Sequence, residues 1–152
     1  RLVGSEMCIR DRTTIAEKLD AILDLMEFSS RMKDYYDIYY LANKFDFDGA
    51  TLTKALKKTF ENRGHSFTVE QFEQVMAFAE NDAMQKKWKA FCRKIDTKTD
   101  DFNTVLKTIK EFLIEPYKAA VADIKYTKIW LANNNSWIQG GNDNDENSIC
   151  RT

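Results

Sequence analysis

Apolar residues recur every three or four positions along most of the chain, which is the spacing that gathers side chains on one face of an α-helix. One clear stripe joins Ile15, Leu19, Ile22 and Met26. The expected helices cover residues 14–28, 31–45, 48–63, 68–95 with a break near residues 81–82, 102–115 and, after an interruption at Pro116, 116–125. We therefore predict an all-α bundle of five or six helices.

Polar residues mark where several of these helices begin. Thr14 with Glu17 and Thr68 with Gln71 have the spacing of a capping box, in which each residue binds a free backbone amide of the other. The D-x-D sequence at residues 46–48 lies between two helical patterns and beside a glycine. We predict a turn there, with its last aspartate capping the next helix.

Composition narrows the class of protein. The chain has 152 residues, of which 43% are hydrophobic, enough for one sizeable core. A net charge of −1 gives no overall attraction to nucleic acid or to a membrane surface. No apolar run approaches the roughly 20 residues that span a bilayer. The three cysteines form neither a metal-binding spacing nor an even set, so a reducing cytoplasm is the simplest location.

The first twelve residues are unusual for the start of a protein. The hexapeptide Met7–Arg12 can be encoded by a nucleotide string that resembles the transposase end sequence used in sequencing libraries. We therefore predict that residues 1–12 derive from a sequencing adapter and that the gene's own sequence starts near Thr13. The alternative is a native, disordered N-terminal arm.

The organisation that follows from these patterns is simple. Residues 13–126 form the helical domain, and residues 127–152 form a tail. Trp130, Trp137 and Ile138 can dock on the core, and the polar segment after Gly140 is expected to be disordered.

Two acids in the second helix stand where a core residue is expected. Asp34 and Asp37 share a helical stripe with the apolar residues Ile38, Leu41 and Phe45. Because a lone buried carboxylate is costly, the two acids must face a cleft, a cation or a metal. The simpler alternative is that they are acids of a helix N-terminus with local partners at the preceding basic residues.

The sequence motif around Asp34 and Asp37 gives a more specific interpretation of their function. The pattern Arg31-x-Lys33-Asp34-x-x-Asp37, which follows the pair Glu17-Lys18, resembles the last two motifs of the AbiEii/AbiGii-type nucleotidyltransferases. The later motif matches in full, whereas the earlier motif matches at its Glu-Lys pair and departs upstream of it.

This resemblance implies the helical C-terminal half of a polymerase-β-like toxin that transfers a nucleotide from an NTP to an acceptor such as tRNA, with an antitoxin as its partner. Lys18 would contact the triphosphate, Asp34 and Asp37 would complete or orient the catalytic site, and Arg31 and Lys33 would support the bound nucleotide. The full-length parent would use Mg²⁺ and an NTP. We expect no metal site and no activity in this fragment, because it lacks the metal-binding carboxylates.

Other functional interpretations stay open at this point. Lys18 can be an ordinary surface lysine, so its closeness to Asp34 or Asp37 is a prediction to be tested. A non-enzymatic helical module is the alternative function, with Lys86, Lys89 and Arg93 on a basic face, flanked by the lysines at 87 and 94, that binds RNA or a protein partner. The only histidine, His65, is expected to be a solvated loop residue without acids around it.

Overall fold

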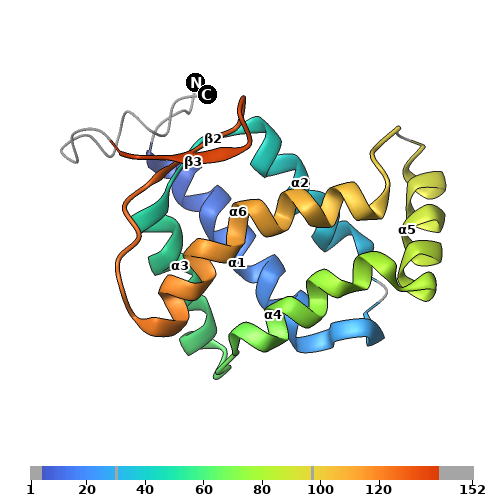
Figure 1. Cartoon of the computed structure of the whole chain (residues 1–152), viewed down its shortest axis with the longest axis horizontal. Helices are drawn as coiled ribbons and strands as arrows, with labels where there is room; N and C mark the ends of the chain where they lie inside the picture. Colours follow the sequence, from blue (N-terminus) through green and yellow to red (C-terminus); the bar gives the residue numbers. More distant parts are fainter. Residues whose placement is uncertain (1–4, 30, 97, 141–152) are drawn as a thin grey trace.

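The computed structural model describes residues 5–29, 31–96 and 98–140, with side chains described from residue 10 onward. Figure 1 shows a helical bundle with a small sheet at one edge. The elements are α1 (Ser5–Leu25), η1 (Met26–Phe28), α2 (Met32–Lys44), β1 (Phe47–Asp48), α3 (Gly49–Asn62), α4 (Val69–Met76), η2 (Ala77–Glu80), α5 (Asp82–Ile95), α6 (Phe102–Ala122), β2 (Ile129–Leu131) and β3 (Ser136–Ile138). The predicted helical bundle is confirmed.

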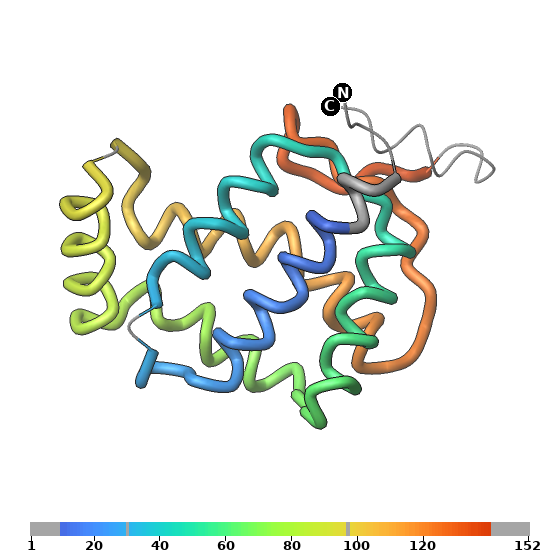
Figure 2. Tube along the Cα trace, turned by 180° about the vertical axis from the view of Figure 1, so that it is seen from behind, coloured from blue at the N-terminus to red at the C-terminus, as the bar shows by residue number. Residues whose placement is uncertain are grey.

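The core lies between two layers of helices. α1 packs against both α2 and α3, and α6 packs against the same two helices from the other side. Figure 2 shows α1, α2 and α3 side by side, with α6 behind them. α4 contacts α6 and α1, whereas α5 stands at the edge of the bundle and contacts α2. Within the described ranges, each helix is too short or too polar to cross a bilayer.

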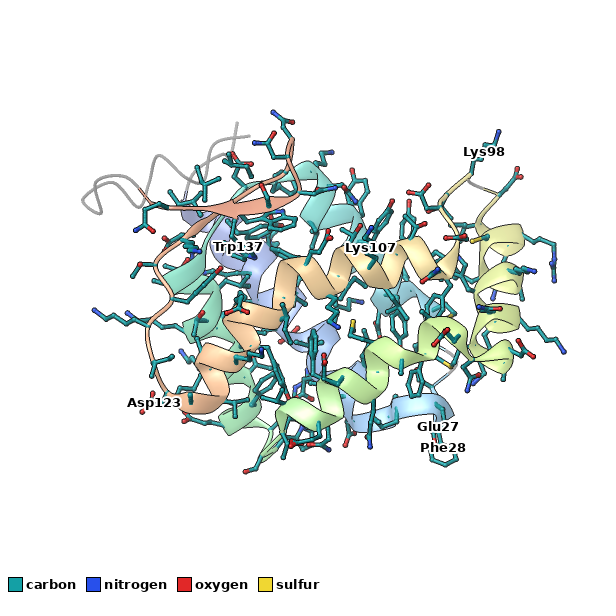
Figure 3. The ribbon with its side chains drawn as sticks, viewed as in Figure 1. Glu27, Phe28, Lys98, Lys107, Asp123 and Trp137 are labelled. Atoms are coloured by element: carbon teal, nitrogen blue, oxygen red, sulfur yellow. The ribbon has the colours of Figure 1, made fainter. Side chains whose placement is uncertain are left out.

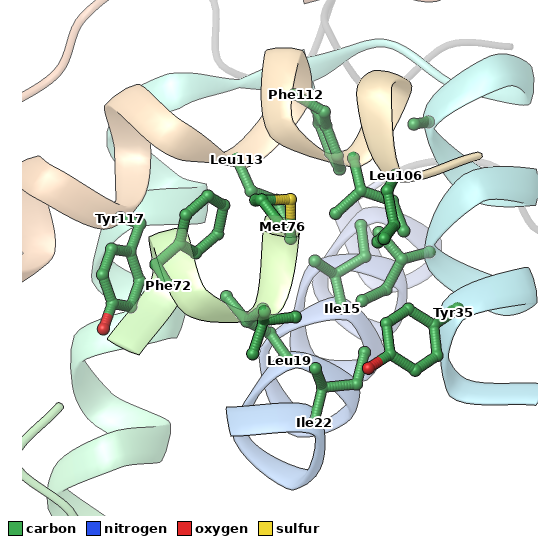
Figure 4. Packing of buried hydrophobic residues seen from close by; sticks show 14 of the residues in the cluster. Ile15, Leu19, Ile22, Tyr35, Phe72, Met76, Leu106, Phe112, Leu113 and Tyr117 are labelled. Carbon is green, nitrogen blue, oxygen red and sulfur yellow. The ribbon is translucent and has the colours of Figure 1, made fainter. Parts of the chain in front are cut away.

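The apolar stripe of α1 supplies the centre of the core, as its spacing predicts. Ile15, Leu19 and Ile22 are at most 1% exposed. Figure 4 shows them in one cluster with Leu106 and Phe112 of α6. Removing such side chains from water is the main favourable contribution to folding, at roughly 25 cal/mol per Å² of apolar surface.

Side chains satisfy the free backbone amides at several helix starts. The carboxylate of Asp48 accepts a hydrogen bond from the backbone of α3, and Asp101 does the same for α6. The capping box between Thr68 and Gln71 is present in both directions at the start of α4. Asn81 caps α5, which explains the break that the pattern predicts near residues 81–82. Capping residues in the sequence therefore mark where helices start after residue 48.

The start of α1 is a correction. The helix runs from Ser5, so Thr14 lies in its interior and the predicted capping box with Glu17 is wrong. No proline or glycine occurs between Ser5 and Thr14, so nothing in the sequence stops the helix there. The assignment of residues 1–12 to an adapter stays a prediction.

A second correction concerns Pro116, which was expected to end one helix and start another. α6 instead continues through Pro116 to Ala122. A proline has no amide hydrogen to donate to the carbonyl four residues earlier, which here belongs to Phe112. The indole Nε1 of Trp137 donates to that carbonyl at 3.0 Å. A side chain from the C-terminal hairpin therefore fills the gap that the proline leaves.

The sheet is a third correction, because the sequence predicted no strands. β1, β2 and β3 form an antiparallel sheet in that order, with Phe47 opposite Trp130 and Trp130 opposite Trp137. Trp130 is fully buried, and its indole donates to the carbonyl of Ala42 at 2.7 Å. A Cβ on Gly49 would lie 2.6 Å from the carbonyl oxygen of residue 128, so this close approach needs glycine.

The remainder of the expected tail differs from residue to residue. Trp137 is half-buried against the ring of Phe112, whereas Ile138 is exposed and does not dock. The segment expected to be disordered after Gly140 lies outside the described residues, as do Cys150 and the side chain of Cys8.

Candidate active site

Two carboxylates and one ammonium group meet where α1 packs against α2. Nζ of Lys18 on α1 lies 3.2 Å from Oδ1 of Asp34 and 3.2 Å from Oδ2 of Asp37, both on α2. The predicted closeness of Lys18 to the two acids is confirmed. We call Lys18, Arg31, Lys33, Asp34 and Asp37 the Lys18 cluster.

The local fold explains why a carboxylate can be buried here. Asp34 lies in the first turn of α2, where free backbone amides and the helix dipole favour a negative charge. Its side chain is only 1% exposed. Burial of that charge is stable because Lys18 and Arg31 both approach it. Asp37, one turn later, is more accessible and shares the same ammonium group.

Two further cations stand at the outer edge of the cluster. Nε of Arg31 lies 3.3 Å from Oδ2 of Asp34, and Nζ of Lys33 lies 2.8 Å from Oδ2 of Asp37. The side chains of Arg31 and Lys33 are 60% and 69% exposed. The pair of Lys33 with Asp37 is of the more exposed kind within one helix that contributes only about 0.2–0.5 kcal/mol. Lys33 can therefore turn toward a bound anion at little cost to the fold, whereas Arg31 also compensates the buried charge of Asp34.

The two acids keep Lys18 positively charged. Partial burial of Lys18 lowers its pKa, but the hydrogen bonds and charges of Asp37 and Asp34 outweigh this effect and raise the pKa above its ordinary value. Lys18 is therefore a permanent cation at neutral pH. It can stabilise negative charge on a ligand, and it cannot act as a general base.

The charge balance of the cluster suits an anion better than a metal ion. Its three cations surround two carboxylates, which leaves one positive charge in excess. Among the described residues, no group of three or more His, Cys, Asp or Glu could hold a metal ion. Mg²⁺ prefers carboxylate oxygens that are free to bind it, and these are already paired with cations. The Lys18 cluster therefore does not fit Mg²⁺.

One oxygen of Asp34 is less well satisfied than the others. Oδ2 has no hydrogen bond in the described structure, although Nε of Arg31 lies 3.3 Å away. That contact is an electrostatic attraction without hydrogen-bond geometry, and Arg31 also donates from Nη2 to Oδ1 of Asp34 at 3.4 Å. The Arg31 side chain is the more exposed of the two cations at Asp34, at 60% against 23% for Lys18.

Comparison with known protein families now bears on the cluster. The model of the nucleotidyl transferase AbiEii toxin family, of the Type IV toxin–antitoxin system, matches residues 8–113, which is more than half of the chain. The chain belongs to the AbiEii family. The match includes every residue of the Lys18 cluster, and so confirms the resemblance that the motifs indicated. Searches of curated proteins and of solved structures found no significant match.

A second group of charged residues on α1 was missed by the AbiEii motifs and by the helical pattern. Nδ1 of His65 lies 2.9 Å from Oδ2 of Asp20, and its Nε2 lies 3.6 Å from Oδ1 of Asp24. Nη1 of Arg63 lies 3.4 Å from Oδ1 of Asp20. We call Asp20, Asp24, Arg63 and His65 the Asp20 cluster. The expectation that His65 is a solvated residue without nearby acids is wrong.

A signal for the Asp20 cluster was present in the sequence. Asp20 lies four residues after Ala16 and three before Leu23, which are both buried. It therefore occupies a core position of α1 and is 1% exposed, although an aspartate was expected on the outer face. An acid at a core position needs a base from elsewhere in the fold, and the loop after α3 carries the only histidine.

The basic face predicted on α5 is present in part. Lys86, Lys89 and Arg93 are exposed, but Lys87 turns inward toward the α1–α2 turn. Lys89 and Arg93 border a cavity of about 490 Å³ that Trp88 also lines. This face is separate from the Lys18 cluster, because it belongs to the helix at the edge of the bundle (Figure 1).

Proposed function

We propose that this chain takes part in nucleotidyl transfer and that the Lys18 cluster contacts the triphosphate of the NTP. The convergence of Lys18 with Asp34 and Asp37, inside the region that matches the AbiEii family, carries the proposal. An ion pair that only joins two helices needs one acid and one base. This cluster has in addition a second acid and two exposed cations, Arg31 and Lys33, which face solvent.

Each residue of the cluster then has a chemical task. In nucleotidyl transfer an acceptor hydroxyl loses its proton to solvent or a base and its oxygen bonds to the α-phosphorus, while the bond from that phosphorus to the α–β bridging oxygen breaks. The departing pyrophosphate gains negative charge. A cation held in place before the reaction stabilises that charge without reorganisation. Lys18 supplies this cation, and Asp34 and Asp37 keep it charged and oriented. Arg31 and Lys33 attract the phosphates from the exposed side.

The proposal assigns the metal to another part of the enzyme. Nucleotide substrates carry Mg²⁺, which the Lys18 cluster does not fit. We propose that a longer parent protein supplies the metal-binding carboxylates and that this chain is its helical C-terminal portion. An acceptor such as tRNA, an antitoxin and action in the cytoplasm complete the proposal. The free thiol of Cys92 is compatible with a reducing compartment.

Transfer of label from an α-³²P-labelled NTP to total tRNA tests this function. The 152-residue chain is compared with the longer product of the same locus, and we expect label on tRNA from the longer protein alone. Full activity of the 152-residue chain would contradict the assignment of the metal. Normal activity of the longer protein with Lys18→Met would contradict the role of the cluster.

A second candidate function has its own observation in support. The exposed cations Lys86, Lys89 and Arg93 on one face of α5 suit the phosphates of an RNA backbone. Binding of a labelled RNA oligonucleotide at several salt concentrations tests it. The triple variant K86E/K89E/R93E should lose affinity, whereas Lys107→Glu on the exposed face of α6 should not.

A further inference from the structure

The turn between α1 and α2 displays an apolar side chain to solvent. Phe28, in η1, is 84% exposed, more than any other large hydrophobic residue described. Figure 3 shows its ring extending from the ribbon, away from the bundle. A single exposed apolar residue is ordinary in itself, and it indicates a binding surface only where its backbone is ordered and further apolar surface lies beside it.

The turn is held in place by bonds from another helix. Nζ of Lys87 on α5 donates to the carbonyl of Glu27 at 3.0 Å and to the carbonyl of Ser29 at 2.9 Å. These carbonyls lie on either side of Phe28. Met26 adopts a left-handed conformation, with φ of 52°, which costs an L-residue roughly 1–2 kcal/mol. The backbone around Phe28 is therefore held in one conformation, although that conformation is strained at Met26.

A groove of about 670 Å³ lies beside the ring. Its apolar part is formed by Leu25, Met26, Phe28, Ala77 and Phe78. Its charged residues are all acidic, namely Asp24, Glu27 and Glu80, and the described residues that line it include no lysine or arginine. This surface combines an apolar centre with a negative border.

We propose that Phe28 and this groove, here called the Phe28 surface, bind a basic segment of a partner protein that carries a large apolar side chain. The partner's apolar residue fits the groove, and its lysines or arginines pair with the acidic border. Aromatic anchors at the centre of a contact commonly carry much of the binding energy. A turn that is already ordered loses little conformational entropy on binding.

Charge decides between this partner and two others. The negative border repels nucleic acid, whose phosphates need cations. A second copy of the chain would have to place the basic face of α5 in the groove, and such a head-to-tail contact leaves both surfaces open for further copies. The inference goes beyond the proposed transfer reaction and does not depend on it, because no residue of the Lys18 cluster lines the groove.

Selection of random peptides by phage display tests the proposal. A library is selected on the immobilised 152-residue chain and depleted on the Phe28→Ala variant. We expect the enriched peptides to carry net positive charge and at least one large apolar residue. Synthetic copies should bind the wild-type chain about tenfold more tightly than Phe28→Ala or the double variant E27K/E80K.

Matched variants at the far end of α6 control for loss of apolar area and for change of charge. Ile124→Ala removes an exposed apolar residue and Glu115→Lys reverses an exposed charge, and neither should alter peptide binding. All these variants should unfold at the wild-type temperature because the altered side chains are exposed. Absence of enrichment, enrichment of acidic peptides, or equal binding to Phe28→Ala would overturn the proposal.

Two further measurements address the other partners. Sedimentation of the free chain reports self-association, and a dimer that Phe28→Ala abolishes would assign the surface to a second copy. Displacement of the selected peptide by an RNA oligonucleotide would assign it to nucleic acid. Either result would overturn the basic protein segment as the partner.

Discussion

The two faces of α1 each bury a carboxylate, but they balance it in opposite ways. In the Lys18 cluster one cation is shared by two acids of the neighbouring helix. In the Asp20 cluster one acid is shared by two bases from the end of α3 and the loop after it. Asp34 and Asp20 are equally buried, at 1% exposed.

This comparison shows what distinguishes a ligand site from a structural ion pair. Two exposed cations, Arg31 and Lys33, stand at the edge of the Lys18 cluster, whereas the Asp20 cluster has the exposed cation Arg63 together with a second exposed acid, Asp24. The Lys18 cluster has one positive charge in excess and is therefore the better site for an anionic nucleotide. Burial of a carboxylate is thus no mark of a functional site by itself, and the balance of the charged groups around it has to be considered.

The largest expected difference between the clusters is in catalysis. In the longer enzyme that we propose, Lys18→Met should lower kcat/KM for the NTP by about 10²–10³-fold, since a preorganised charge at the leaving group is lost. His65→Gln, which breaks the Asp20 cluster, should leave kcat/KM unchanged. Steady-state kinetics with a saturating acceptor measures both. Equal losses in the two variants would mean that the Lys18 cluster acts only through the fold.

The second largest expected difference between the clusters is in the free energy of unfolding that each contributes. Lys18→Met leaves the buried carboxylate of Asp34 with a single weak partner, so we expect a loss of about 2–3 kcal/mol in the free energy of unfolding. His65→Gln leaves Asp20 paired with Arg63 and should cost only about 1 kcal/mol. Urea denaturation of the 152-residue chain measures both losses. A larger loss for His65→Gln would reverse the comparison.

Between neutral and alkaline pH, the stabilisation by Lys18 should be lost only at high pH. Its pKa in the folded chain is raised above the ordinary value of 10.5, so its contribution is complete below that pH and is lost as the pH rises through the folded pKa. The difference in unfolding free energy between wild type and Lys18→Met should be constant from about pH 7 to 10 and then decrease. A decrease below pH 9 would contradict the assigned charge.

Two tyrosines with raised pKa values also titrate at alkaline pH, so the effect of Lys18 has to be measured as the difference between wild type and Lys18→Met. Burial, with help from the hydrogen bond to Asp100, raises the pKa of Tyr39 to about 12, and burial raises the pKa of Tyr126 to about 12. Both groups are present in the wild type and in the variant. Their effect therefore cancels in the difference.

The smallest effect should come from the exposed cations. Lys33→Ala should change the free energy of unfolding by less than about 0.5 kcal/mol, as expected for an exposed pair, and Arg31→Ala should cost more because its partner Asp34 is buried. Each should nevertheless weaken NTP binding by the longer enzyme, and more so at low salt, because the screening length there is longer. Binding isotherms at two ionic strengths check this. A salt-independent loss would indicate a structural role.

Much of the helical part of this fold was predictable from local signals. Helical spacing and the caps at Asp48 and Thr68 located several helix starts. The sheet was not predictable, because its strands have two or three residues each and β1 pairs with a segment far along the chain, with Phe47 opposite Trp130. Continuation of α6 through Pro116 depends on a side chain that lies 21 positions later, at Trp137.

Prediction of the candidate site succeeded and failed for the same physical reason. Asp34 and Asp37 were noticed because acids interrupt an apolar stripe, and the motif then named Lys18 as a partner. Asp20 interrupts a buried stripe too, but that stripe begins at the small residue Ala16 and was not identified. Its partner His65 comes from a loop, where spacing carries no information about neighbours.

The hydrogen bond from Trp137 to the carbonyl of Phe112 makes the C-terminal hairpin a support for α6 at the point where Pro116 leaves an acceptor free. A chain cut before Ile129 would keep the sequence of every helix, but the carbonyl of Phe112 would lose the indole of Trp137 as its hydrogen-bond donor. Such a loss costs about 1–3 kcal/mol. The two short strands after the last helix therefore stabilise α6. A chain shortened to its helices should have a less stable α6.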